Sequence, residues 1–232
     1  MCRMVGFIAS GLVGTASYVQ ALRYQAEHGV HAPHRDGWGF CVYTDDGCSF
    51  QKSAKAAFED EYTGPSAALT ALFHARQASS HAHTVDSAAI PWEDAHPFVF
   101  QRGDHVWSFV HNGTVRDLPE AWGDGTDSQV YAHLLETAMV QGCSPIEAVR
   151  SVVRTIREQA HADSLNALLA TDDELIAVRC SDLGHTLFYH NSSALFEVST
   201  EPLALAWNEV SIGTMLDVRR DADGLSLQTI LL

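Results

Sequence analysis

The stretch TDSQVYAHLLETAMVQGCSPIEAVRSVVRTI, residues 126–156, predicts two consecutive helices. Thr126 and Gln129 fit a capping box, in which a Ser or Thr and a Glu or Gln three residues later satisfy each other's backbone amides. Ser144 and Glu147 repeat this pattern, with a proline at the first helical position, where proline is favoured. A glycine between the two segments ends the first helix, so we expect an antiparallel helix pair.

Strand-like segments lie on both sides of this helix pair. Before it, one further helix is expected at Ser17–Glu27, and strands are expected at Met4–Ala9, Gly39–Thr44, Ser49–Ser53, Ala71–Arg76, Phe98–Gln101 and His105–His111. After it, strands are expected at Ala167–Thr171, Leu175–Arg179, Thr186–His190, Leu195–Ser199 and Ser226–Leu231. Two groups of strands around a helix pair predict sheet packed on sheet with helices outside. We find no repeat or linker, so we expect a single domain over residues 1–232.

The composition excludes several classes of protein. The chain has 14 basic and 29 acidic residues and a formal charge of -15, which argues against partners such as nucleic acids or anionic membranes. Its five cysteines form no C-x-x-C pair and suggest neither a disulfide framework nor a zinc site. The apolar N-terminus lacks the features of a signal peptide, and no apolar run reaches about 18 residues, so a cytoplasmic protein is expected.

Cys2 follows the initiator methionine directly. If Met1 is removed, Cys2 carries both a thiol and a free α-amine. The unperturbed pKa of a thiol is about 8.5 and that of an α-amine about 7.7 to 8.0, so the amine can accept the thiol proton. Cys2 is therefore a candidate nucleophile with its own base, although a buried structural cysteine is the ordinary alternative.

Four further residues carry groups that suit this chemistry. Asn112 and Gly113 follow an apolar strand and offer two neighbouring donors for an oxyanion, although an Asn-Gly pair also forms ordinary turns. Asn112 also begins a glycosylation sequon, which has no role without a signal peptide. Arg76 ends another strand and could grip a carboxylate, or could be an ordinary exposed arginine. Asp127 could bind an ammonium group or simply stabilise the N-terminus of its helix.

Six short motifs occur in the order found in one family. They are Met1-Cys2-Arg3-Met4-Val5-Gly6, His34-Arg35-Asp36-Gly37-Trp38-Gly39, His74-Ala75-Arg76, Ala95-His96-Pro97-Phe98, Phe109-Val110-His111-Asn112-Gly113 and Thr126-Asp127-Ser128. In this set and order the chain resembles the class II glutamine amidotransferases, which are N-terminal-nucleophile hydrolases. The resemblance continues as far as Ser199-Thr200-Glu201-Pro202-Leu203 and so spans most of the chain.

The resemblance implies an α+β fold, a four-layer α/β/β/α sandwich of two antiparallel sheets. It implies that Cys2 is the nucleophile and that its own α-amine is the base. Asn112 and the backbone N–H of Gly113 would hold the oxyanion. The implied reaction is attack on a γ-glutamyl amide, loss of ammonia or an amine, and hydrolysis of a γ-glutamyl thioester, without a cofactor.

The resemblance also implies a substrate-binding set. Arg76 would bind the glutamyl α-carboxylate and Asp127 its α-ammonium group. His96 and Trp38, which lie within the matching motifs, would be further substrate contacts. One departure, Ser79-Ser80 in place of the Thr-His of synthase-linked relatives, puts the finer carboxylate contacts in doubt.

The length predicts a small standalone member of this family, similar to the γ-glutamyl amide hydrolases of thiol and ergothioneine metabolism. The expected partner is a small γ-glutamyl substrate. One alternative is a glutaminase subunit that delivers ammonia to a separate synthase; a homo-oligomer is also possible. A second alternative is an inactive relative that acts as a scaffold. A third is a metal-dependent hydrolase, for which the histidines that cluster around one loop are His74, His81, His83 and His96.

Overall fold

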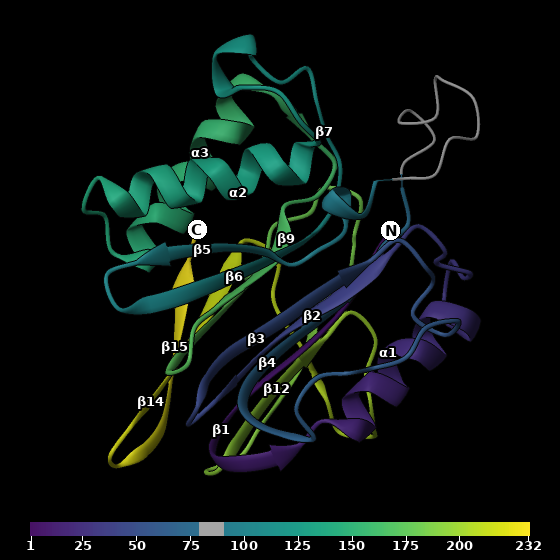
Figure 1. Cartoon of the computed structure of the whole chain (residues 1–232). Coiled ribbons are helices and arrows are strands. Elements are labelled where there is room, and N and C mark those ends of the chain that lie inside the picture. Colours follow the sequence, from purple (N-terminus) through teal and green to yellow (C-terminus); the bar gives the residue numbers. More distant parts are fainter. Residues whose placement is uncertain (79–90) are drawn as a thin grey trace.

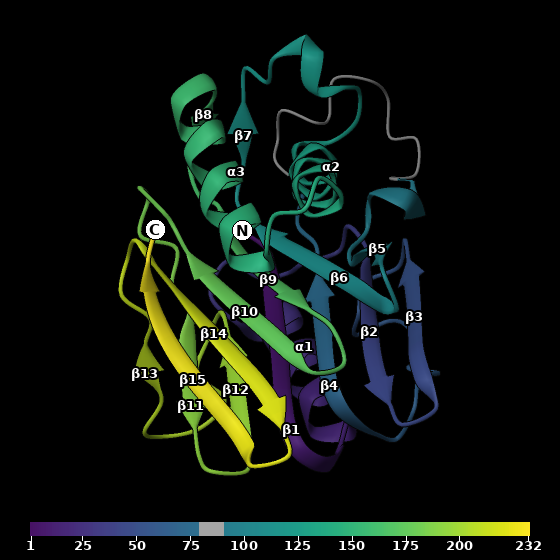
Figure 2. The same cartoon turned by 90° about the vertical axis from the view of Figure 1, so that its left-hand side faces the viewer.

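The computed structural model describes residues 1–78 and 91–232, in which two large antiparallel sheets pack face to face (Figure 1, Figure 2). The first sheet has the strand order β13-β11-β12-β1-β4-β2-β3. Its strands are β1 (Arg3–Gly14), β2 (Trp38–Thr44), β3 (Gly47–Ser53), β4 (Ala67–Ala75), β11 (Phe188–Asn191), β12 (Leu195–Ser199) and β13 (Asn208–Glu209).

The second sheet has the order β15-β14-β10-β9-β6-β5. Its strands are β5 (Phe98–Arg102), β6 (His105–Asn112), β9 (Asn166–Ala170), β10 (Glu174–Arg179), β14 (Thr214–Asp221) and β15 (Gly224–Leu231). Two short strands, β7 (Val115–Arg116) and β8 (His161–Ala162), form a separate pair beside it.

Helices cover the outer face of each sheet. Helix α1 (Ala16–His28) lies on the first sheet, whereas α2 (Asp127–Val140) and α3 (Pro145–Gln159) lie on the second (Figure 1). Short 3₁₀ turns occur at Trp92–Asp94 and Glu120–Trp122. The layers are therefore α/β/β/α, and the predicted α+β sandwich is confirmed. None of the helices in the described ranges has the length and apolar run needed to cross a membrane.

The alternation of side chains along β1 shows how the sequence builds these layers. Met4 and Ile8 belong to the apolar core between the two sheets, whereas Val5 and Phe7 belong to the core under α1. Successive residues of a strand point to opposite faces, so a continuous apolar run can supply both cores. A third core, which includes Leu135, joins α2 and α3 to the second sheet.

Both predicted capping boxes are present. The Thr126 side chain accepts a hydrogen bond from the backbone N–H of Gln129, and the Gln129 side chain accepts one from the backbone N–H of Thr126. Ser144 and Glu147 make the same reciprocal pair at the start of α3. These bonds satisfy amides that would otherwise lack partners at a helix N-terminus.

Among the differences between the predicted and observed strands, two are the most extensive. Strand β1 continues to Gly14, beyond the predicted end at residue 9, and its added residues are mostly exposed. Strand β14 was not predicted, because Asp217 and Arg219 break its apolar pattern. The guanidinium of Arg219 lies 3.1 Å from the carboxylate of Asp217 on the same strand and 3.0 Å from that of Glu174 on the neighbouring strand β10.

Strand pairing brings the ends of several elements together. Arg3, at the start of β1, pairs with Ala75, at the end of β4. This register places Cys2 close to Arg76, although 74 positions separate them in the sequence. The end of β6 at Asn112 and the start of α2 at Asp127 lie at the same end of the sandwich.

Candidate active site

A cavity of about 500 Å³ lies where these elements meet. Five of the seven residues predicted for the site line it: Cys2, Arg76, His96, Gly113 and Asp127. A sixth, Asn112, is fully buried and contacts Cys2 directly. Trp38 is not among the lining residues.

The thiol of Cys2 is nearly buried, with 8% of the residue exposed. Its Sγ lies 3.5 Å from the backbone nitrogen of Gln77 and 3.7 Å from the Gln77 carbonyl oxygen. Burial raises the pKa of the Cys2 thiol above its usual value, while the positive N-terminus and Arg76 act in the opposite direction. The thiol is therefore protonated at neutral pH and needs a base before it can act as a nucleophile.

Asn112 ends strand β6 next to Cys2. Its Oδ1 accepts a hydrogen bond of 2.8 Å from the backbone nitrogen of Cys2. This contact fixes the orientation of the amide and leaves Nδ2 buried, without a hydrogen-bond partner among the described residues. A buried N–H donor without an acceptor costs free energy. Such a cost is expected where the acceptor is the oxygen of a ligand.

Gly113 can only be a glycine in this backbone. A Cβ atom at this position would lie 1.8 Å from the backbone oxygen of Ser164 and 2.7 Å from Nε2 of His111. The strand therefore brings the Gly113 backbone to the cavity wall with no room for a side chain.

Arg76 is held in place through its backbone. Its N–H donates to the oxygen of Gly37 at 2.8 Å, and its carbonyl oxygen accepts from the N–H of Asp36 at 3.2 Å. The guanidinium is mostly buried, and its Nη2 lies 3.8 Å from the Asp94 carboxylate. Nη1 is buried and has no hydrogen-bond partner in residues 1–78 and 91–232. The arginine thus presents one buried, unused donor at the cavity.

Asp127 is the first residue of α2, and backbone amides already hold its carboxylate. Oδ2 accepts from the N–H of Val115 at 2.8 Å, and Oδ1 accepts from the N–H of Ser128 at 2.9 Å. A carboxylate can accept about four hydrogen bonds, so lone pairs remain for a ligand. Asp127 therefore both stabilises the helix N-terminus and offers negative charge to the cavity.

Three buried histidines form the wall behind the cavity. The rings of His96 and His74 lie 4.0 Å apart, and Nε2 of His74 lies 3.1 Å from the carbonyl oxygen of His111. Burial lowers the pKa of all three rings, that of His74 to about 3, so they are neutral at pH 7. Neither ring nitrogen of His96 has a hydrogen-bond partner within the described ranges. His96 can therefore offer an N–H and a lone pair to a bound ligand.

Two further polar residues line the cavity, and the sequence analysis gave neither of them a role in the site. Asp94 is the ion-pair partner of Arg76. The side-chain amide of Gln129 points its Nε2 at the Asp94 carboxylate from 3.5 Å, while its Oε1 accepts from the N–H of Thr126 at 2.7 Å. No sequence signal distinguishes Asp94 from other surface acids. Gln129 was visible only as a capping residue.

The family model for "Glutamine amidotransferases class-II" matches residues 1–198. The chain belongs to the class II glutamine amidotransferases. Glutamine amide hydrolysis and ammonia transfer are the general chemistry of this family. In sequence, this amidotransferase is 27% identical over 115 residues to the putative glutamine amidotransferase YafJ of Escherichia coli K12, an alignment that covers 49% of the chain and 43% of YafJ.

Solved structures show the same fold. The glutamine phosphoribosylpyrophosphate amidotransferase of B. subtilis superposes with a TM-score of 0.71 at 15% identity, over 98% of this chain and 49% of that one. The amidotransferase described here thus spans about half the length of that enzyme. A predicted glutamine amidotransferase from Pseudomonas aeruginosa PA01 superposes with a TM-score of 0.58 at 20% identity, over 93% of this chain and 96% of that one. A glutamine aminotransferase class-II domain protein from Silicibacter pomeroyi superposes with a TM-score of 0.61 at 17% identity, over 98% of both chains.

Trp38 lies in the core of this amidotransferase and away from the cavity. It is 1% exposed and packs against Phe40, and its Nε1 donates to the Asp60 carboxylate at 3.1 Å. Its position therefore does not support the prediction that Trp38 touches the substrate.

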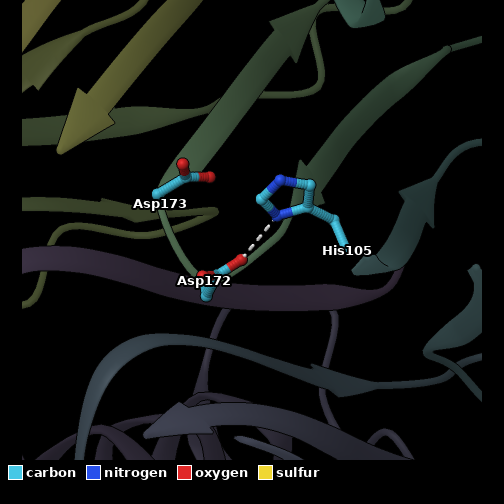
Figure 3. Close-up of side chains that lie close together, drawn as sticks. All are labelled: His105, Asp172 and Asp173. Carbon is cyan, nitrogen blue, oxygen red and sulfur yellow. Dashed lines mark hydrogen bonds and ion pairs between the residues drawn. The ribbon is translucent and has the colours of Figure 1, made fainter. Parts of the chain in front are cut away.

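The predicted metal cluster is only partly described, because His81 and His83 lie outside the described residues, as do Ser79 and Ser80. A different group, His105 at the start of β6 and the neighbouring Asp172 and Asp173, brings three candidate ligand atoms within 4.8 Å of one another (Figure 3). Nδ1 of His105 lies 3.0 Å from the Asp172 carboxylate. The hydrogen bond to Asp172 raises the pKa of His105, which favours an ion pair between the two side chains.

Proposed function

We propose that this class II amidotransferase hydrolyses a γ-glutamyl amide bond with Cys2 as the nucleophile, once Met1 has been removed. The observation that carries the proposal is the 2.8 Å contact between the Cys2 nitrogen and Oδ1 of Asn112. It ties the backbone of the nucleophile to a buried amide whose Nδ2 is still without an acceptor among the described residues. Nucleophile and oxyanion donor are thereby fixed relative to each other, as electrostatic stabilisation requires.

The charges of the cavity suit the amino-acid end of a glutamyl group. The unused Nη1 of Arg76 would bind one oxygen of the α-carboxylate, and the second oxygen of that carboxylate could reach Nη2 of the same guanidinium. Asp127 would bind the α-ammonium group through the lone pairs that its two backbone contacts leave. His96 adds a neutral contact that either a donor or an acceptor on the substrate can use.

The reaction begins with proton transfer from the thiol to the α-amine of Cys2. The thiolate attacks the amide carbon, and the negative charge that develops on the amide oxygen is held by Nδ2 of Asn112 and the N–H of Gly113. The C–N bond breaks as the ammonium group of Cys2 returns the proton to the leaving nitrogen. Water then hydrolyses the γ-glutamyl thioester, assisted by the same amine.

Processing of the N-terminus is part of this proposal. While Met1 is present, the nitrogen of Cys2 belongs to a peptide bond and cannot accept a proton. Because burial raises the pKa of the thiol, spontaneous ionisation would supply little thiolate at neutral pH. A tag that stays in front of Cys2 should therefore abolish activity, and an active tagged chain would contradict the role given to the amine.

The decisive experiment compares the processed wild type with the Cys2→Ala variant. Ammonia release from glutamine, and amine release from a panel of γ-glutamyl amides, would be followed by coupled assay and mass spectrometry. We expect turnover by the wild type only, and equal rates would refute the proposal. A preference for one γ-glutamyl amide over glutamine would identify a free hydrolase, while a glutaminase rate that rises with an added synthase would identify an ammonia-supplying subunit.

A further inference from the structure

His34 lies fully buried beside the N-terminus, and both of its ring nitrogens face backbone carbonyl oxygens. Nε2 lies 2.5 Å from the oxygen of Met1, and Nδ1 lies 3.3 Å from the oxygen of Ala26. Burial and the nearby Arg3 lower the pKa of His34 to about 4. The ring is therefore neutral at pH 7 and carries a single N–H. One of the two carbonyl oxygens must face a ring nitrogen that has no hydrogen to donate.

The Met1 carbonyl group is bonded to the nitrogen of Cys2. With a C=O bond of about 1.2 Å and a C–N bond of about 1.3 Å, Nε2 of His34 lies at most about 5 Å from that nitrogen. Removal of Met1 takes the carbonyl group away from Nε2 and leaves a free α-amine at the Cys2 nitrogen, within about 5 Å of the ring. The ring can then donate from Nδ1 to Ala26, while its Nε2 lone pair faces the amine directly or through one water molecule.

We propose that His34 is a positioning residue for the α-amine of Cys2 in the processed chain, an inference that rests on the proposed function. A neutral primary amine has two N–H groups and one lone pair. Oδ1 of Asn112 already accepts from this nitrogen and would take one N–H. Nε2 of His34 would take the other. The remaining lone pair is then directed to the thiol, which is the arrangement that a base for that thiol needs.

The two acceptors are uncharged, and this matters for a base. A carboxylate in the place of His34 would stabilise the ammonium form and raise the pKa of the amine, whereas neutral acceptors orient the amine with a smaller effect. Among residues 1–78 and 91–232, the charged and titratable groups around the N-terminus are Arg3, Arg76, Asp127, Glu201, His74 and His185. Of these, Arg3 donates to the Cys2 carbonyl oxygen at 3.4 Å and is paired with Glu201 at 2.7 Å.

The test uses full-length chain released from a fusion by cleavage directly before Cys2, with the mass of each variant checked. His34→Gln keeps an acceptor near the ε position of the ring, whereas His34→Asn places its amide near the δ position. We expect His34→Ala and His34→Asn to lower kcat for glutamine about tenfold or more, with KM within about twofold of wild type, and His34→Gln to retain most of the activity.

The dependence of kcat/KM on pH distinguishes a positioning role of His34 from a merely structural one, because a structural role would not shift the profile. An acceptor stabilises the protonated amine, so its loss lowers the amine pKa. We therefore expect the acid limb of the kcat/KM profile to shift to lower pH in the Asn and Ala variants and to stay in place in the Gln variant. His28→Ala, an exposed histidine at the end of α1, is the control and should match wild type.

Several results would overturn this role. They are an Ala variant within twofold of wild type, equal losses in the Gln and Asn variants, or a rise in KM with kcat unchanged. If His34→Ala does not fold, the comparison of Gln with Asn at matched Tm decides. Equal rates for wild type and Cys2→Ala would refute the proposed function itself, whereas a Cys2-dependent enzyme that ignores His34 would refute only this inference.

Discussion

Replacement of Gly113 by alanine tests the oxyanion site through the backbone. The new Cβ would lie 1.8 Å from the Ser164 oxygen, and real Cβ atoms essentially never come closer than 3.0 Å, so the chain must shift by about 1.2 Å. A misplacement of about 1 Å in a catalytic group can cost about 100-fold in rate, or about 2.7 kcal/mol in the activation free energy. We expect kcat for glutamine to fall by about that factor. Overpacking should also destabilise the fold by about 1 to 3 kcal/mol.

The assay is steady-state hydrolysis of glutamine at saturating substrate, well below the Tm of the variant. Gly11→Ala is the matched control, because a Cβ there meets nothing within 4 Å, and its kcat should equal that of wild type. The reasoning is refuted if Gly113→Ala is folded and its kcat stays within about threefold of the control. Such a result would mean that the N–H of Gly113 does not hold the oxyanion.

Three other changes give distinct readouts. Arg76→Ala removes charge-assisted hydrogen bonds worth about 1.5 to 3 kcal/mol, so KM for glutamine should rise about 10- to 100-fold, and an unchanged KM would remove Arg76 from the site. Ser144→Ala breaks the capping box of α3 and should lower Tm by about 2 to 4 °C with kcat unchanged; an unchanged Tm would show that the cap contributes nothing. The pKa of His105, measured by NMR titration, should lie above 6.5 and should fall in the Asp172→Asn variant. Because this pKa is raised in the folded state, the contribution of His105 to stability is complete below about pH 6.5 and disappears as the pH rises through the folded pKa. A value of 6.5 or below would contradict the ion pair.

Local rules predicted the parts of the fold that depend on neighbouring residues. The capping pairs that begin with Thr126 and Ser144 were recognisable because each is complete within four residues. The motif that contains Asn112 and Gly113 was recognisable because two adjacent residues carry it: Asn112 supplies a side-chain amide, and Gly113 supplies a backbone that leaves no room for a side chain. Strand β14 could not be recognised in the same way, because the buried Asp217 interrupts its apolar pattern. Asp217 is paired with Arg219 on the same strand, and Arg219 also contacts Glu174 on the next strand, which a local pattern does not reveal.

The candidate site was less visible in the sequence than the fold. Two charged residues that line the cavity, Arg76 and Asp127, stand at element ends, where charge is conspicuous in the sequence. Trp38 belongs to a matching motif, but its position on β2 directs its side chain to the core beneath α1. The motif alone does not show this direction. Asp94 is important only because β4 and the 3₁₀ turn before β5 bring it to Arg76, a juxtaposition of distant segments that no short sequence pattern encodes.

Gln129 links two properties that usually vary independently. One end of its amide closes the first turn of α2, and the other end points at the partner of Arg76. Glutamate would serve the first task equally well, yet it lacks the donor that the second requires and would bring two carboxylates together. A substitution at this single position therefore changes both the stability of the helix and the electrostatics of the pocket.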